Sequence, residues 1–265
     1  MPERLIQLIR NQQLMFLRSL LRERVTVYLP DGNSFDVIFK SNKTYQAARR
    51  FTNFEPEFLD EFIINLQRCR VFYDVGSYIG LYSLSALSYR EDAIVVAIDP
   101  DPLNCRTLER NIRCNKFDNR SDVICVALSD ADGSIQFSFS GEYGGSSGHV
   151  KRLSDPDSRK SVPIYKLDTL IQKNRLPPPE LIKIDVEGYE AHVLRGMEET
   201  IGNFSPIIMV EVHPQFLENY GESASAIDSF FEAKGYLKKT LHVPGPNSKT
   251  KHRQYHISYF PNKIP

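Results

Sequence analysis

The sequence has no excess of charge of either sign. Its 33 lysine and arginine residues are matched by 33 aspartate and glutamate residues. A balanced chain has no overall field that attracts nucleic acid or an anionic membrane face, so we expect no nucleic-acid partner. With 41% hydrophobic and 25% charged residues, the composition is that of an ordinary globular protein with enough material for a core.

Cysteine patterns and long apolar runs are also missing. Cys69, Cys105, Cys114 and Cys125 form no C-x-x-C pair and have no histidine at zinc-ligand spacing, so we expect reduced, mostly buried thiols. No apolar run reaches the roughly 18 residues that a membrane span needs, and the N-terminus lacks the apolar core of a signal peptide. These absences favour a cytoplasmic protein without stable membrane insertion.

A helix and a hairpin are predicted before the main domain. Leucine and isoleucine recur at helical spacing through residues 3–24, and residues 25–39 form two extended runs around a turn. We divide the chain into this extension, residues 1–54, and a main domain, residues 55–265. The helix is expected to dock on the main domain or on a second copy in a homodimer; a basic amphipathic helix at a membrane surface is the alternative.

The main domain shows alternating strand and helix patterns. Asn53 is expected to cap its first helix, with Pro56 in the first turn. Extended runs rich in apolar residues, typical of parallel strands covered on both faces, follow at 71–75, 93–98, 123–128, 181–187 and 206–213. Helical spacing occupies segments between and after them, at 81–89, 102–115, 189–201 and 224–234.

The remaining strands complete the predicted fold. An alternating strand at 135–139 is expected to pair at the edge of the sheet, and strands at 236–243 and 255–260 close the chain as a hairpin. We therefore predict an α/β fold: a Rossmann-like, doubly wound, mostly parallel seven-stranded sheet with a terminal antiparallel strand, plus the N-terminal helix and β-hairpin extension.

A turn bounded by glycines follows the first strand. The run from Val71 ends near the acid Asp74, and Gly76 and Gly80 precede a helical pattern. Glycine tolerates positive φ and a close ligand, and the new helix points free N–H groups at the turn. The spacing Asp-x-Gly-x-x-x-Gly differs from the Gly-x-Gly-x-x-Gly of dinucleotide-binding proteins, so a phosphate-bearing ligand is disfavoured. An acid at the strand end instead suits a ligand that presents a cation.

Charged residues stand at the ends of other predicted strands. Asp99 ends the second strand, where an acid accepts hydrogen bonds from ribose hydroxyls in nucleotide-binding βαβ units. Asp185 and Glu211 end two later strands. Burying an unpaired charge is unfavourable, and ligands of such sheets bind beyond the carboxyl ends of the strands. We therefore expect Asp74, Asp99, Asp185 and Glu211 to share one cleft.

The same segments resemble the FkbM-like family of class I S-adenosylmethionine-dependent methyltransferases. The resemblance extends from about Glu55 to His213. Its carriers are Asp74 to Gly80, Asp99-Pro100 with Asn104 and the helix Leu108 to Asn115, Ala127 to Asp130, Leu167-Asp168, Leu181 to Glu190, Leu194 to Gly196, and Val210 to His213. The most specific of them is the block Lys183 to Glu190. The sequence departs from the family at Ser77-Tyr78, where Ala-Asn is usual, and at Asp99, where glutamate is frequent. Residues before Glu55 and the Gly/Ser-rich loop 141–148 carry little resemblance, and we expect them to set acceptor choice.

The resemblance implies S-adenosylmethionine as cofactor. It places Asp74, Gly76 and Gly80 around the methionine part and Asp99 on the ribose. The adenine is expected near Ala127, Leu128 and Ser129, and the predicted binding site is completed by Ser77, Tyr78, Pro100, Asn104 and Asp185.

An activated methyl group mainly needs an aligned acceptor and a nearby proton acceptor. We predict Asp185 or His213 as the base, with Glu187 and Glu211 orienting the acceptor; Lys183 is either a further catalytic residue or a structural partner for an acid. We expect no metal, and a divalent ion held by Asp185, Glu211 and His213 is the alternative.

The predicted activity is O-methylation of a hydroxyl on a sugar, glycan or secondary metabolite. N-methylation of a peptide side-chain amide and a non-catalytic cofactor-binding scaffold are the alternatives, so the acceptor is a small molecule, a glycan or a peptide. A nicotinamide dehydrogenase would need the missing dinucleotide fingerprint. A nucleic-acid methyltransferase is disfavoured by the missing Asn/Asp-Pro-Pro-Tyr/Phe segment and by the zero net charge.

Overall fold

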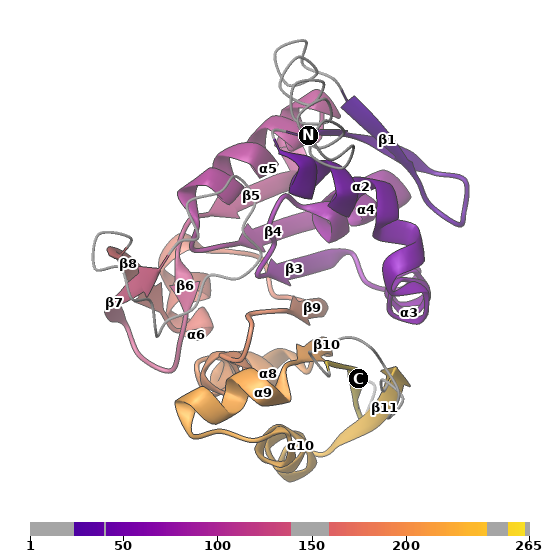
Figure 1. Cartoon of the computed structure of the whole chain (residues 1–265). Helices are drawn as coiled ribbons and strands as arrows, with labels where there is room; N and C mark the ends of the chain where they lie inside the picture. Colours follow the sequence, from indigo (N-terminus) through magenta and orange to yellow (C-terminus); the bar gives the residue numbers. More distant parts are fainter. Residues whose placement is uncertain (1–23, 40, 139–158, 243–253, 263–265) are drawn as a thin grey trace, which may run out of the picture.

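The computed structural model of the chain describes residues 24–39, 41–138, 159–242 and 254–262 (Figure 1). The helix predicted for residues 3–24 lies outside these ranges except for Arg24, and its docking or dimer contact lies outside them too. The predicted Gly/Ser-rich loop 141–148 also falls outside. Within the described residues, no helix is both long enough and apolar enough to cross a membrane.

A seven-stranded sheet forms the centre of the molecule. Its spatial order is β11 (Tyr236–His242), β12 (Tyr255–Pro261), β10 (Ile207–Val212), β9 (Leu181–Ile184), β3 (Val71–Val75), β4 (Ile94–Ile98) and β5 (Ser121–Ile124). The pairs from β5 to β10 are parallel, and β12 runs antiparallel to both of its neighbours. The predicted mostly parallel sheet with one terminal antiparallel strand is therefore confirmed.

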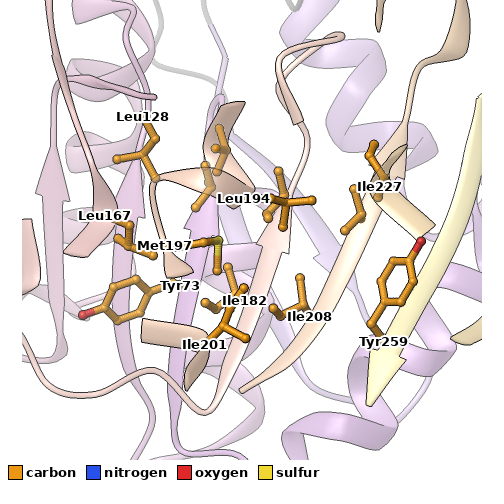
Figure 2. Packing of buried hydrophobic residues seen from close by; sticks show 14 of the residues in the cluster. Tyr73, Leu128, Leu167, Ile182, Leu194, Met197, Ile201, Ile208, Ile227 and Tyr259 are labelled. Atoms are coloured by element: carbon orange, nitrogen blue, oxygen red, sulfur yellow. The ribbon is translucent and has the colours of Figure 1, made fainter. Parts of the chain in front are cut away.

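Helices cover both faces of this sheet. One face packs against α3 (Pro56–Leu66), α4 (Leu81–Tyr89) and α5 (Pro102–Cys114). The other packs against α6 (Leu167–Asn174), α7 (Glu190–Arg195), α8 (Glu198–Phe204), α9 (Pro214–Leu217) and α10 (Ala224–Ala233). Side chains alternate between the two layers, since Tyr73 and Ile182 lie in the second core while Phe72 and Leu181 lie in the first. Figure 2 shows the second core, in which Leu194, Met197 and Ile201 pack over Ile182 and Ile208.

The N-terminal hairpin is fixed on the first of these layers. Its strands β1 (Arg24–Tyr28) and β2 (Ser34–Ile38) are antiparallel, as predicted. The backbone N–H groups of Asp36 and Ile38 donate to Asn115 Oδ1 and Asn111 Oδ1 of the α5 region, both at 2.8 Å. Because Val37 is fully buried in the core that α4 and α5 share, the hairpin and this side of the sheet form one packed unit.

A helix that we did not predict follows the hairpin. It is α2 (Asn42–Phe54), whose N-cap Ser41 accepts a hydrogen bond from Thr44 N at 3.1 Å. Asn53 lies inside this helix, so the prediction that it caps the next one is wrong. The next helix, α3, begins at Pro56 as expected, and its N-cap Glu55 makes no side-chain capping bond. Glu55 is therefore available for other contacts.

The predicted strand 123–128 is two strands in two sheets. After η1 (Asp118–Arg120), β5 ends at Ile124 on the edge of the large sheet, and β6 (Ala127–Leu128) pairs with β8 (Arg159–Tyr165). The strand β7 (Gly133–Ser138) pairs with β8 as well, in a three-stranded sheet of order β6-β8-β7. The prediction that the 135–139 strand lies at the edge of the main sheet is therefore wrong; Figure 1 shows this small sheet beside the large one.

Two later elements are shorter than predicted. Strand β9 ends at Ile184, so Asp185 and Glu187 lie in the loop after it rather than on its face. The helix expected over 189–201 is divided into α7 and α8 around Gly196, where a Cβ would lie 1.9 Å from the carbonyl oxygen of Ser129. This close approach fixes the β6 region against the helix pair. A short helix η3 (Glu218–Tyr220) then precedes α10.

Candidate active site

Two adjoining cavities open at the carboxyl ends of the central strands. The first, which we call the β4 cavity, includes in its lining the predicted residues Gly76, Tyr78, Asp99, Pro100, Asn104, Ala127, Leu128, Asp185 and Glu187. The second, which we call the α2 cavity, includes Asp74, Gly76, Ser77, Tyr78, Lys183, Asp185, Glu187, Glu211 and His213. Asp185 and Glu187 line both cavities and lie where they meet. Of the predicted site residues, Gly80 and Ser129 line neither.

The glycines of the first turn are required by packing within the chain. Gly76 has φ +79° and Gly80 has φ +87°, a region that favours glycine. A Cβ on Gly76 would lie 1.8 Å from the carbonyl oxygen of Asp185, and one on Gly80 would lie 2.0 Å from Leu108 Cδ1. Gly76 therefore lets the β3 turn approach the end of β9, and Gly80 lets α4 approach α5.

Asp99 is held by donors from three residues. Tyr78 N donates to Oδ2 at 2.8 Å, while Asp101 N and Asn104 Nδ2 donate to Oδ1 at 2.8 and 3.1 Å. Burial raises the pKa of this carboxyl to about 7 in spite of these donors. Tyr78, where the sequence departs from its family, has a positive φ of 52°. The carboxyl of Asp99 is thus fixed in orientation at the β4 cavity, and Asn104 positions it.

A buried lysine lies among acids at the centre of the site. Lys183 Nζ lies 3.1 Å from Asp185 Oδ2 and 4.9 Å from the centroid of the Tyr82 ring. Burial alone would lower the pKa of Lys183, but Asp185, Asp74 and Glu211 together raise it above its ordinary value. Asp74 Oδ2 accepts hydrogen bonds from Ser83 N at 3.1 Å and Ser83 Oγ at 2.6 Å, at the start of α4. Lys183 is therefore a charged partner for acids rather than a proton acceptor.

His213 lies between acids from three elements. Its Nδ1 is 2.9 Å from Glu190 Oε1, and its Nε2 is 3.4 Å from Glu211 Oε1 and 3.8 Å from Glu187 Oε2. Burial alone would lower the pKa of His213, but hydrogen bonds with Glu190 and Glu211 raise it to about 11. An imidazole that stays protonated at neutral pH has no lone pair for an incoming proton. This charge state argues against His213 as the general base.

A second histidine reaches Glu211 from the last strand. Strand β12 pairs His256 with Glu211 of β10, and His256 Nε2 lies 3.8 Å from Glu211 Oε1 and 3.4 Å from Glu55 Oε1. The His256 ring stacks on Phe58, with centroids 4.8 Å apart. Burial alone would lower the pKa of His256, but Glu211 and Glu55 raise it to about 9. Burial alone would raise the pKa of Glu211, but the two histidines hold it well below its usual range.

Two carboxyls remain at the junction of the cavities. Burial and the charge of Glu211 raise the pKa of Asp185, while Lys183 opposes this shift. Burial and the charge of Asp185 raise the pKa of Glu187 to about 8, and Glu187 has a positive φ of 54°. Asp185 is thus a carboxyl group with a raised pKa at the junction, and Glu187 is a carboxylic acid near neutral pH. The two can accept and donate a hydrogen bond, respectively.

Sequence analysis missed three residues of this cluster. Glu190 is fully buried and pairs with His213. In the sequence it is only the last residue of the block that ends at Glu190, and its distance along the chain from His213 does not indicate the pairing. His256 belongs to a strand that joins the site by antiparallel pairing across a long insertion. Glu55 precedes a helix, a position where an acid is ordinarily explained by the helix dipole. The alternation of His256 with apolar neighbours was the signal that could have identified it.

Among the described residues, two groups have the composition of a metal site. Ligand atoms of Asp185, Glu211 and His213 lie within 4.8 Å of one another, as do those of Glu55, Glu211 and His256. These donor sets would fit a divalent ion. In this structure the same side chains form ion pairs, His213 with Glu190 and Glu211 and His256 with Glu55 and Glu211. A histidine that ligates a metal would have to lose its proton. The absence of a metal stays a prediction.

Comparison with known proteins identifies the family of the chain. Residues 74–238 match the model of the methyltransferase FkbM domain. The hexuronic acid methyltransferase AglP of Haloferax volcanii is 27% identical over 143 residues, which cover 54% of this chain and 56% of that protein. A methyltransferase FkbM from Methylobacillus flagellatus KT is 18% identical, with a TM-score of 0.49 and 72% and 43% of the two chains covered. The matches thus span about half the length of these two proteins.

One solved structure from another organism shares the fold. The SAM-dependent methyltransferase from Agrobacterium tumefaciens is 12% identical, with a TM-score of 0.50 and with 91% of this chain and 71% of that chain covered. The family match covers more than half of the sequence and extends from the end of β3 through β10 within the large sheet. The chain belongs to the FkbM methyltransferase family.

Proposed function

We propose that this protein transfers a methyl group from S-adenosylmethionine to a hydroxyl of a sugar, glycan or secondary metabolite. The observation that carries the proposal is the position of Asp185, a carboxylate with a raised pKa that lines both cavities where they meet. The β4 cavity would hold the adenosine part of the cofactor, the methionine part would reach the junction near Ser77, and the α2 cavity would hold the acceptor. Asp185 would then face the reacting atoms of both.

The residues around the cavities fit the cofactor. Asp99 lines the β4 cavity with a carboxyl that is fixed in orientation, which suits ribose hydroxyls. The hydroxyl of Ser77 is buried, lines the α2 cavity and has no hydrogen-bond partner among the described residues. A buried polar group without a partner is unfavourable, so Ser77 would gain from a polar group of the methionine part. When bound, S-adenosylmethionine supplies a methyl group already activated on a cationic sulfonium.

The protein's own task is to position the acceptor and to remove a proton. Asp185 would accept the proton of the acceptor hydroxyl, and its raised pKa makes it a better base than an ordinary aspartate. Lys183, 3.1 Å away, favours the charged form of Asp185 that this role needs. Glu187 would donate a hydrogen bond to an acceptor oxygen, and Glu211, held by two protonated histidines, would accept one. The apolar residues around the cavities would limit access of water.

The sugar class of acceptor has separate support from a relative. The Haloferax volcanii relative carries the name hexuronic acid methyltransferase, which indicates a sugar acid as its substrate. A carboxylate base and several acceptor-orienting carboxyls also suit a molecule with many hydroxyl groups.

Methyl transfer from labelled S-adenosylmethionine tests the proposal. We would incubate the protein with the cofactor carrying a ¹³C methyl group and with panels of sugars, phenolic metabolites and peptides, and record carbon spectra of the products. The expected signal is an O-methyl carbon, with the rate reduced about a hundredfold or more in Asp185→Asn. Asp92→Asn, an exposed aspartate that lines neither cavity, is the matched control. An N-methyl product, or full turnover in Asp185→Asn, contradicts the proposal.

A further inference from the structure

One side of helix α2 faces the α2 cavity. Lys43, Ala47, Arg50 and Phe54 line it, and their spacing of three or four residues places them along one stripe of the helix. Another stripe, with Thr44 and Ala48, is buried against the protein. One stripe of the helix therefore lines the cavity, while another stripe packs against the protein and fixes the position of the helix.

The two cations of this stripe, Lys43 and Arg50, have no structural role among the described residues. Neither Lys43 nor Arg50 has an ion-pair partner among the described residues, and both are exposed. Lys43 lies in the first turn of α2, which contains no acid. A cation there faces the positive end of the helix dipole, so it does not stabilise the helix. These side chains remain available for an anion from outside the chain.

The floor of the same cavity has the opposite charge. Carboxyl groups that can carry a charge line it in excess over cations, with Asp74, Asp185, Glu211 and Glu55 against Lys183 and His213, while Glu187 is a neutral acid. An acidic group on an acceptor would be repelled by this floor and attracted by Lys43 and Arg50. A hydroxyl group of the same molecule would find hydrogen-bond partners on the floor. The charge distribution thus sets one orientation for an anionic acceptor.

An exposed aromatic ring completes this side of the cavity. Phe54 lines it with 68% of its surface exposed. A large apolar side chain that is exposed at the mouth of a cavity offers a surface on which the C–H face of a sugar ring can pack. The stripe therefore combines two cations with one apolar contact surface.

We propose that Lys43 and Arg50 bind an acidic group, a carboxylate or a phosphate, on a sugar acceptor whose hydroxyl faces Asp185. This inference rests on the proposed function and names the class of acceptor: an anionic sugar, either a uronic acid or a sugar phosphate. The acidic group lies at α2, the ring lies near Phe54, and the reacting hydroxyl lies at the junction of the two cavities.

Binding of three matched sugars tests the inference without turnover. We would titrate glucose, glucuronate and glucose 6-phosphate into the protein loaded with S-adenosylhomocysteine and measure dissociation constants by calorimetry. At least one acid should bind about five- to tenfold more tightly than glucose, as expected for two exposed ion pairs. This preference should shrink as salt is added. The acid that binds more tightly, glucuronate or glucose 6-phosphate, shows whether the recognised group is a carboxylate or a phosphate.

Two variants of α2 distinguish binding at Lys43 and Arg50 from a general effect of positive charge. The double variant Lys43→Gln/Arg50→Gln should bind the acid no better than glucose. Arg49→Gln, an exposed arginine of the same helix that lines neither cavity, should keep the preference. Equal binding of all three sugars, no binding of either acid, or a preference that survives in the double variant would overturn the inference. Failure to bind S-adenosylhomocysteine at the outset would instead count against the proposed function.

Discussion

The imidazole of His213 joins two carboxylates, with Nδ1 2.9 Å from Glu190 Oε1 and Nε2 3.4 Å from Glu211 Oε1. Glu190 begins α7, and Glu211 lies in β10, so one protonated side chain links the helix after the β9 loop to the neighbouring strand. Gly188 N also donates to Glu190 Oε1, at 3.0 Å. The loop that carries Asp185 and Glu187 is therefore held from its far end by this pair.

The protonation of His213 predicts a loss of stability at alkaline pH. Its pKa is about 11 in the folded protein and about 6.5 in the unfolded chain, so the folded state binds its proton more tightly. The resulting stabilisation is fully present below pH 6.5 and falls as pH rises toward 11. Between pH 7.5 and 9.5 we expect this residue to lower the free energy of unfolding by about 1.4 kcal/mol per pH unit.

Chemical denaturation across this pH range measures the effect. The double variant His213→Gln/Glu190→Gln removes the charge pair and should show a slope that is shallower by about that amount. The single variant His213→Gln, which leaves Glu190 buried without its cation, should be less stable by about 3 to 5 kcal/mol at pH 7. Equal slopes in wild type and double variant would show that His213 is not protonated in the folded state.

The close approach of Gly76 to Asp185 predicts a large penalty for a side chain. Gly76→Ala would place Cβ 1.8 Å from a backbone oxygen and add strain from positive φ. We expect a loss of about 3 kcal/mol or more in the free energy of unfolding. Gly221→Ala is the matched control, because Gly221 has φ +74° but no atom within 4 Å of the new Cβ. Similar losses for the two variants would mean that backbone strain, not the contact with Asp185, determines the effect.

The raised pKa of Glu187 predicts a fall in turnover above about pH 8. Burial keeps this carboxyl protonated at neutral pH, and its ionisation would add a negative charge beside Asp185. Glutamine resembles the protonated acid, so Glu187→Gln should keep most of its activity at pH 7 and lose the alkaline fall. Rates measured from pH 6 to 9.5 at constant ionic strength test this. A variant that still shows the wild-type alkaline fall would assign that titration to another group.

The ion pairs of both histidines predict a metal-independent enzyme. Dialysis against EDTA should leave the rate unchanged, and added Mg²⁺ or Mn²⁺ should not raise the melting temperature. Activity that is lost on dialysis and restored by one of these ions would instead make Asp185, Glu211 and His213 its ligands.

Local patterns in the sequence were sufficient for the sheet and for most of the cavity lining. The apolar runs of β3, β4, β9 and β10 are continuous because both faces are covered, and an acid at or just beyond a strand end stands out against them. The division of 123–128 into β5 and β6 was not visible, since both halves are equally apolar and differ only in their partners. Helix α2 was missed although its Ser41 and Thr44 capping pair is local.

The charge network was less predictable than the fold. Glu211 meets His256 through antiparallel pairing of β10 with β12, and Glu190 at the start of α7 meets His213 just after β10. Both contacts depend on distances between elements, which spacing along the chain does not give. The same contacts decide which groups carry a proton, so the choice between Asp185 and His213 as base needed the structure.

Calorimetric titration with S-adenosylmethionine, and separately with NAD, tests the central claim most directly. We predict micromolar binding of S-adenosylmethionine to the wild-type protein, no binding of NAD, and loss of S-adenosylmethionine binding in Asp99→Ala, whose carboxyl lines the β4 cavity. No binding of S-adenosylmethionine to the wild-type protein, or equal binding to Asp99→Ala, would contradict the assignment of this cavity to the cofactor.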